Sequence, residues 1–282
     1  MIHSFLMIGQ SNMAGRGYLK EVPLIFDEKI KMLRNGRWQI LSEPVNYDRP
    51  VAGASLAVSF AAAWRMDHGQ EEAGLIPCAE GGASLDDWTV GSALFTHAIL
   101  QARLAQRSSK LTALLWHQGE SDCFPDRAAV YSEKLGVIVD ALRRELDAPD
   151  MPLIVGGLGD YLTSGIYGQY FSAYAQVNEA LRHFALTQPH CYYVSATGLS
   201  SNPDGVHLNA VSLRRFGIRY YRAFDKRRHI EVPEEEDSLL ATIYNRPFNQ
   251  GELIALLELQ FAGGSLTPEE YTRQLEDLRK QG

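Results

Sequence analysis

Three residues far apart in the chain could together supply a nucleophile, a base and a carboxylate that orients the base. Ser11 follows an apolar run in the motif GQSNM (9–13), whereas Asp204 and His207 are separated by two residues in a glycine-containing loop. A carboxylate that accepts from the imidazole Nδ1–H leaves Nε2 free to take the serine proton, so that the serine oxygen can attack a carbonyl carbon. The residues therefore indicate nucleophilic catalysis. Alternatively, Ser11 only caps a helix, and Asp204 and His207 only precede another helix.

N–H groups that could bind a developing oxyanion occur near two other apolar runs. Gly81 and Gly82 allow the backbone to approach a ligand without side-chain obstruction, and Gln118 carries a side-chain amide. Together with the Ser11 N–H they would make three donors, each typically worth about 10²–10³ in rate at comparable sites. A plain turn accounts equally well for the two glycines.

These residues need a scaffold that brings their loops together, and the apolar pattern predicts one. Continuous rather than alternating apolar runs, typical of short buried strands, occupy residues 2–8, 73–79, 111–117, 151–157 and 190–195. Apolar residues at helical spacing occupy 55–67, 93–107, 127–146, 170–187 and 210–227. Strands that alternate with helices predict a parallel sheet between helical layers, with ligands bound beyond the carboxyl ends of the strands. Four of the five loops at those ends carry the residues named above.

Three segments stand outside this alternation. Residues 18–50 have weak periodicity and are expected to form a long excursion near the end of the first strand. We predict a body over residues 1–228, an acidic linker over 229–248 and a helical hairpin over 249–282. Its two helices are expected at about 250–261 and 268–280, the second one started by the capping-box pattern Thr267-Pro-Glu-Glu. The hairpin is too small for much of a core of its own, so we expect it to dock on the body or on another copy of the chain.

The charge of the chain is concentrated in this tail. Residues 229–282 hold four Lys/Arg against eleven Asp/Glu, which accounts for the whole net charge of −7. The first 228 residues carry 23 charges of each sign and are neutral. A neutral body offers no electrostatic footprint for nucleic acid or an anionic membrane, so neither is expected as a partner.

Neither a cofactor nor a metal is expected. Cys78, Cys123 and Cys191 are widely spaced and odd in number, which favours three reduced thiols over disulfides or a zinc site. His117 and Glu120 are poorly placed in a strand-end loop to make two good metal ligands. No apolar stretch approaches the ~20 residues that span a bilayer, and the first residues lack the pattern of a signal peptide. We therefore expect a cytoplasmic protein.

Four motifs, in this order along the chain, resemble those of a known family. GQSNM (9–13), GG-x-S-x-x-x-W (81–88), HQGESD (117–122) and DGVH (204–207) closely resemble the SGNH hydrolases. More narrowly, they resemble carbohydrate esterase family six and the sialate O-acetylesterase-like domains, which are related to acetylxylan esterases. The resemblance covers roughly residues 1–225. It implies a flavodoxin-like three-layer α/β/α fold with a five-stranded parallel sheet, and a serine esterase that removes acetyl groups from sugars.

Carried onto this chain, the resemblance also implies roles for single residues. Ser11 would be the nucleophile, His207 the general base and Asp204 its orienting partner. The oxyanion hole would be formed by the Ser11 N–H, by the glycine pair 81–82 with Gly82 preferred, and by the Gln118 amide. Glu120 would support the histidine or brace its loop.

The tail bears a second, fainter likeness. Residues 256–280, LLELQFAGGSLTPEEYTRQLEDLRK, resemble the short helical hairpins called SHOCT domains, which are usually interaction or oligomerisation appendages. A plain amphipathic hairpin explains the pattern nearly as well. The hairpin is therefore a candidate for joining copies of the chain into a homo-oligomer.

The resulting hypothesis is a serine esterase that removes O-acetyl groups from a sugar, such as an acetylated xylo-oligosaccharide, through an acetyl-serine intermediate. Two alternatives stay open. One is a general short-chain esterase or thioesterase with the same fold, and the other is a non-catalytic carbohydrate-binding protein that uses the same cleft.

Overall fold

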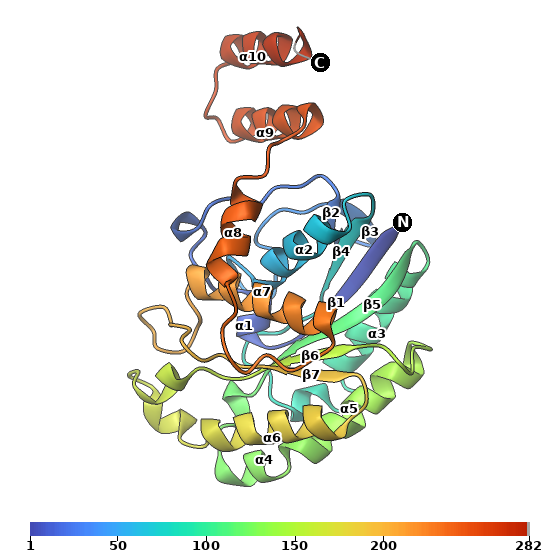
Figure 1. Cartoon of the computed structure of the whole chain (residues 1–282), viewed down its shortest axis with the longest axis vertical. Coiled ribbons are helices and arrows are strands. Elements are labelled where there is room, and N and C mark those ends of the chain that lie inside the picture. Colours follow the sequence, from blue (N-terminus) through green and yellow to red (C-terminus); the bar gives the residue numbers. More distant parts are fainter. Residues whose placement is uncertain (281–282) are drawn as a thin grey trace.

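A seven-stranded sheet forms the centre of the computed structural model, which describes residues 1–280 (Figure 1). The strands are β1 (Ile2–Gly9), β2 (Ile30–Arg34), β3 (Arg37–Ile40), β4 (Glu72–Pro77), β5 (Ser109–His117), β6 (Leu153–Gly156) and β7 (Cys191–Val194). Their order across the sheet is β3-β2-β4-β1-β5-β6-β7, and only β2 and β3 pair antiparallel. The five strands expected from the apolar runs are β4-β1-β5-β6-β7, which have the relative order 2-1-3-4-5 also found in flavodoxin.

The expectation of five strands is wrong in number, because the 18–50 segment adds two. β2 and β3 are joined by Asn35 and Gly36, whose φ angles of 51° and 75° are those of a two-residue hairpin turn. β3 lies at the edge of the sheet, and three of its four residues are exposed. An exposed edge strand needs no continuous apolar run, which is why apolar periodicity did not reveal it.

Helices cover both faces of the sheet, as expected for three layers. On one face lie α2 (Leu56–Asp67) and α7 (Ala210–Lys226), and on the other lie α3 (Ala93–Gln106), α5 (Tyr131–Glu145) and α6 (Tyr174–Thr187). Each face of the sheet has its own hydrophobic core, and successive side chains of β1 point to alternate faces. Phe5 and Met7 pack with α2 and α7, whereas Leu6 and Ile8 pack with α3, α5 and α6. Because both faces of β1 are buried from Ser4 onward, the residues from Phe5 to Ile8 are apolar without alternation.

Two of the expected helices are subdivided. The segment expected over 127–146 overlaps the end of α4 (Pro125–Ala129) and continues into α5 after Val130. The segment expected over 170–187 begins within a 3₁₀ turn, Gly168–Phe171, which precedes α6.

The acidic linker expected over 229–248 is in part a helix. α8 (Glu236–Tyr244) packs against α7, where Glu236 is buried and accepts from Arg219 Nε at 2.6 Å. Leu240 and Ile243 of α8 join the core on that face of the sheet. The many acidic residues of this segment suggested that it is solvated. In the structure, however, buried Arg219 neutralises Glu236, and the helix contributes apolar side chains to the core.

The two expected C-terminal helices are present as α9 (Gln250–Ala262) and α10 (Pro268–Lys280), which extend beyond α8 (Figure 1). The capping box exists, because Thr267 N–H donates to Glu270 and Glu270 N–H donates to Thr267 Oγ1. The start of α9 contacts the body, where Glu252 Oε1 accepts from the Glu28 N–H at 3.1 Å.

Candidate active site

The end of β1 places Ser11 at the rim of the sheet. Gly9 stands opposite His117 of β5, and a Cβ at Gly9 would lie 2.1 Å from the His117 carbonyl oxygen, so this close approach requires glycine. The chain then turns into the short helix α1 (Ser11–Ala14), whose N-cap is Gln10. Ser11 therefore does not cap the helix, and its hydroxyl is left available for another partner.

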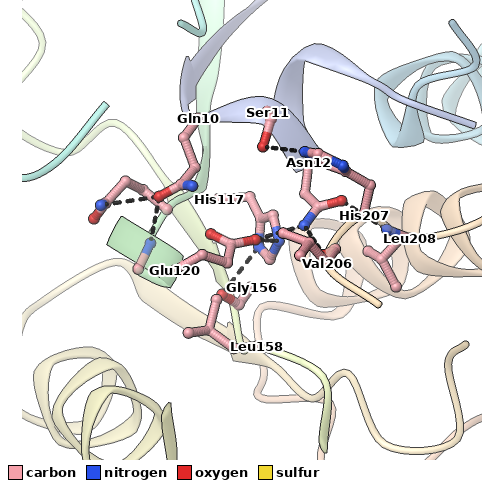
Figure 2. A network of polar contacts seen from close by, with 12 residues as sticks. Gln10, Ser11, Asn12, His117, Glu120, Gly156, Leu158, Val206, His207 and Leu208 are labelled. Atoms are coloured by element: carbon pink, nitrogen blue, oxygen red, sulfur yellow. Dashed lines mark hydrogen bonds and ion pairs between the residues drawn. The ribbon is translucent and has the colours of Figure 1, made fainter. Parts of the chain in front are cut away.

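That partner is His207, so the three residues expected to act together do meet. Ser11 Oγ lies 3.0 Å from His207 Nε2, and His207 Nδ1 lies 2.8 Å from Asp204 Oδ2 (Figure 2 shows the first of these contacts). The other carboxylate oxygen, Asp204 Oδ1, accepts from the backbone N–H groups of Val206 and His207 at 2.8 and 2.9 Å. Burial opposes ionisation, but these bonds together lower the pKa of Asp204 below its ordinary value. The carboxylate is thus charged and fixed where it can orient the imidazole.

A residue that sequence reasoning did not single out holds the loop of His207. Asn12 Oδ1 accepts from the Leu208 N–H at 2.8 Å, and Asn12 Nδ2 is 3.3 Å from the Val206 carbonyl oxygen (Figure 2). The same Nδ2 donates to Glu120 Oε1 at 2.5 Å. Asn12 therefore ties the backbone on both sides of His207 to the end of β5. Its place directly after Ser11 was the signal that could have found it.

Glu120 contacts Asn12 and His117, and it makes no hydrogen bond with His207. Its carboxylate lies 3.5 Å from His117 Nε2, while His117 Nδ1 lies 3.3 Å from the Gly156 carbonyl oxygen (Figure 2). Burial disfavours the charged form, but His117 and Asn12 together hold the pKa of Glu120 below its ordinary value. Of the two roles that the resemblance implied, the contacts match bracing.

Gln118 is not among the residues that line the cavity of Ser11, which does not fit its expected place in the oxyanion hole. The side chain is fully buried, and its Nε2 lies within hydrogen-bond distance of Asp122 Oδ2, Gln10 Oε1 and the Ala83 carbonyl oxygen, at 2.6, 3.1 and 3.1 Å. An amide nitrogen has two hydrogens, and three acceptors inside the protein compete for them. Gln118 is therefore an internal brace.

The two glycines after β4 differ in what their N–H groups do. The Gly81 N–H donates to Asp48 Oδ2 at 2.9 Å and is already used. Gly82 has a φ of 84°, and neither its N–H nor that of Ser11 has an acceptor in residues 1–280. Both Gly82 and Ser11 line the same cavity. These are two unused donors beside the Ser11 hydroxyl.

A cavity of about 480 Å³ opens above Ser11. Its wall also includes Arg16, Arg49, Phe124 and Tyr170. Arg16 is buried and ion-paired with Asp48, and Arg49 is paired with Glu80 at 3.1 Å. Phe124 and Tyr170 are exposed at the rim.

The remaining candidates do not join the site. Cys78, Cys123 and Cys191 are buried free thiols, and burial raises the pKa of Cys191 to about 11. Over residues 1–280, no three His, Cys, Asp or Glu side chains gather as a metal would need. Within the same range, no helix combines the length and the apolar character needed to cross a membrane.

Comparison with known proteins decides the family. Residues 1–226 match the sequence model described as "carbohydrate esterase, sialic acid-specific acetylesterase". The chain belongs to this family. As a member of the sialic acid-specific acetylesterase family it is a carboxylic ester hydrolase with a carbohydrate esterase role, so the non-catalytic alternative is set aside.

Individual proteins resemble the chain in sequence or in fold. A probable carbohydrate esterase of Arabidopsis thaliana is 29% identical over 242 residues, which are 78% of this chain and 89% of the relative. An X-ray structure of an Arabidopsis thaliana protein superposes with a TM-score of 0.71 at 25% identity, covering 79% of this chain and 98% of the other. NanS has the same fold, with a TM-score of 0.63 at 16% identity over 80% of this chain and 97% of its own.

Proposed function

We propose that this member of the family hydrolyses O-acetyl esters of sugars through an acetyl-serine intermediate. The observation that carries the proposal is the series of contacts from Asp204 through His207 to Ser11, with Ser11 at the wall of an open cavity. A charged carboxylate on Nδ1 keeps Nε2 as the acceptor for the Ser11 proton.

The reaction has two matching halves. Ser11 Oγ bonds to the acetyl carbon while its proton moves to His207 Nε2. The bond from that carbon to the sugar oxygen then breaks, and His207 returns the proton to this oxygen. Water repeats the sequence on the acetyl-serine, which releases acetate and restores the Ser11 hydroxyl.

The negative charge that develops on the acetyl oxygen needs donors. The Ser11 and Gly82 N–H groups are unused within residues 1–280, and both residues line the cavity. They are the two backbone donors of the proposed oxyanion hole.

The cavity wall suits a neutral sugar. Both arginines in it are paired with acidic side chains, so neither is a free cation that would demand an anionic group. Exposed aromatic rings at the rim, Phe124 and Tyr170, offer flat surfaces on which a sugar ring can pack. These features favour neutral acetylated sugars, such as acetylated xylo-oligosaccharides.

A substrate panel tests the proposal. Acetate release is measured from O-acetylated xylo-oligosaccharides, O-acetylated sialic acids and 4-nitrophenyl acetate, beside 4-nitrophenyl butyrate and an acyl thioester, with Ser11→Ala as the blank. The proposal expects the highest kcat/KM on an acetylated sugar. A higher value on the butyrate or the thioester would instead identify a general short-chain esterase or thioesterase.

A further inference from the structure

The side chain of Gln10, which the sequence did not point to, lies beside the nucleophile. Gln10 is 3% exposed and lines the cavity together with Ser11, Gly82 and His207. Its Oε1 lies 3.2 Å from the Gly119 N, 3.3 Å from the Ser121 N and 3.1 Å from Gln118 Nε2.

These contacts determine which end of the amide faces the cavity. Two of the three groups around Oε1 are backbone N–H donors, of Gly119 and Ser121, which cannot accept a hydrogen bond. Exchanging the oxygen and nitrogen of Gln10 would put donor against donor at both. In Figure 2 the dashed lines from the Gln10 oxygen run away from Ser11. The Nε2 therefore occupies the opposite position.

The Gln10 Nε2 has no use inside the protein. No acceptor within residues 1–280 bonds to this nitrogen. Since it is also not a fully buried unpaired atom, it keeps some exposed surface. An amide nitrogen of a nearly buried side chain thus keeps access to the cavity with both hydrogens free. This is the property that Gln118 lacks, since its Nε2 is surrounded by Asp122, Ala83 and Gln10 acceptors.

We infer that the Gln10 side-chain amide is the third donor to the ester oxygen, and that Gln118 positions it from behind. The inference rests on the proposed function, because it assigns a role in the same acyl transfer. Gln10 adds a side-chain N–H to the Ser11 and Gly82 backbone donors. Its oxygen is held by the backbone N–H groups of Gly119 and Ser121 and lies 3.1 Å from Gln118 Nε2, so it needs no rearrangement as charge develops.

Gln10→Glu is the sharpest test, because it preserves shape and leaves one oxygen for Gly119 and Ser121. The other oxygen replaces the donor with an acceptor. We expect kcat on 4-nitrophenyl acetate to fall by about 10²–10³, with KM changed less than about threefold and the melting temperature kept. Methylboronic acid forms a tetrahedral adduct on a serine, and we expect its inhibition constant to rise by a similar factor. A donor that stabilises the tetrahedral state contributes to both kcat and boronate affinity, so its removal lowers both together. Gln10→Met, of similar length and without an amide, gives the same readout if Gln10→Glu does not fold.

The outcomes separate this inference from the proposed function. If wild type is active, Ser11→Ala is inactive and Gln10→Glu keeps kcat and boronate affinity within about threefold of wild type, Gln10 is not a donor and the inference is wrong. A loss of kcat without any loss of boronate affinity also overturns it, since that result indicates a purely structural role. If wild type cleaves no ester in the panel, the proposed function itself fails.

Discussion

Asn12 Nδ2 donates to Glu120 Oε1 at 2.5 Å, which connects the residue after Ser11 to a buried carboxylate that follows β5. The same Asn12 bonds to the backbone of Val206 and Leu208, the two neighbours of His207. The position of the His207 loop relative to Ser11 is therefore fixed by the Asn12 side chain.

Asn12→Ala should separate positioning from chemistry. Losing all three contacts lets the His207 loop shift, and a displacement of about 1 Å can cost ~10² in rate, so we expect kcat to fall by about 10²-fold. Asn178→Ala is a matched control, because Asn178 also bonds to both the N–H and the carbonyl oxygen of a loop residue, Leu158, after β6. The control should lose stability and keep kcat within about threefold. Equal kcat losses in the two variants would contradict the account.

Glu120 should make stability depend on pH in a defined direction. Its pKa in the folded protein is below the ordinary value, so its charge adds stability above the unfolded pKa of about 4.3, and this contribution disappears as the pH falls through the lower folded value. Urea unfolding of wild type and Glu120→Gln should therefore show a wild-type advantage at pH 7 that shrinks below about pH 4. A difference that stays constant from pH 7 to pH 3 would contradict this.

Asp204→Asn should remove most activity while the fold stays intact. The Asn oxygen can still accept from the backbone of Val206 and His207, but its amide N–H then faces His207 Nδ1. That arrangement favours the imidazole tautomer with its proton on Nε2, which cannot accept from Ser11. In the known serine protease case this change costs about 10⁴ in kcat, and we expect a loss of about 10³–10⁴. Asp160→Asn, at an exposed residue of another strand-end loop, should keep full activity.

Gly82→Ala tests the backbone donor against a control with nearly the same φ angle. Gly82 and Gly91 have φ angles of 84° and 83°, and at neither would a Cβ meet any atom within 4 Å. Both substitutions should destabilise the fold by about 1–2 kcal/mol, because alanine is strained at positive φ. Only Gly82→Ala should also lower kcat, by more than about tenfold, as its N–H turns from the ester oxygen. The account fails if the two variants have the same kcat.

The sequence predicts the central sheet well for a physical reason. β1 and β5 are covered by helices on both faces, so their buried residues form continuous apolar runs that stand out. The edge hairpin was missed because β3 is mostly exposed, although the Asn35-Gly36 pair carried the turn signal. α8 was missed because Glu236 looks solvated in sequence and is in fact neutralised by a distant arginine.

The site was predictable in its residue types and less so in its hydrogen-bond directions. Ser11, Asp204 and His207 could be paired from the loops that carry them, because the parallel sheet brings those loops to one rim. The same reasoning could not tell which of two glutamines turns its amide to the cavity. Gln10 and Gln118 differ through contacts with Gly119, Ser121 and Asp122, which only the folded chain defines.

The most direct test of the central claim is acetate release by Ser11→Ala compared with Ser164→Ala on the best acetylated sugar. Ser164 is exposed on the loop after β6 and serves as a control for the substitution itself. The account predicts that Ser164→Ala keeps wild-type kcat/KM, whereas Ser11→Ala loses at least about 10³-fold, with its melting temperature unchanged. A folded Ser11→Ala protein that still releases acetate at the wild-type rate would contradict the acetyl-serine mechanism.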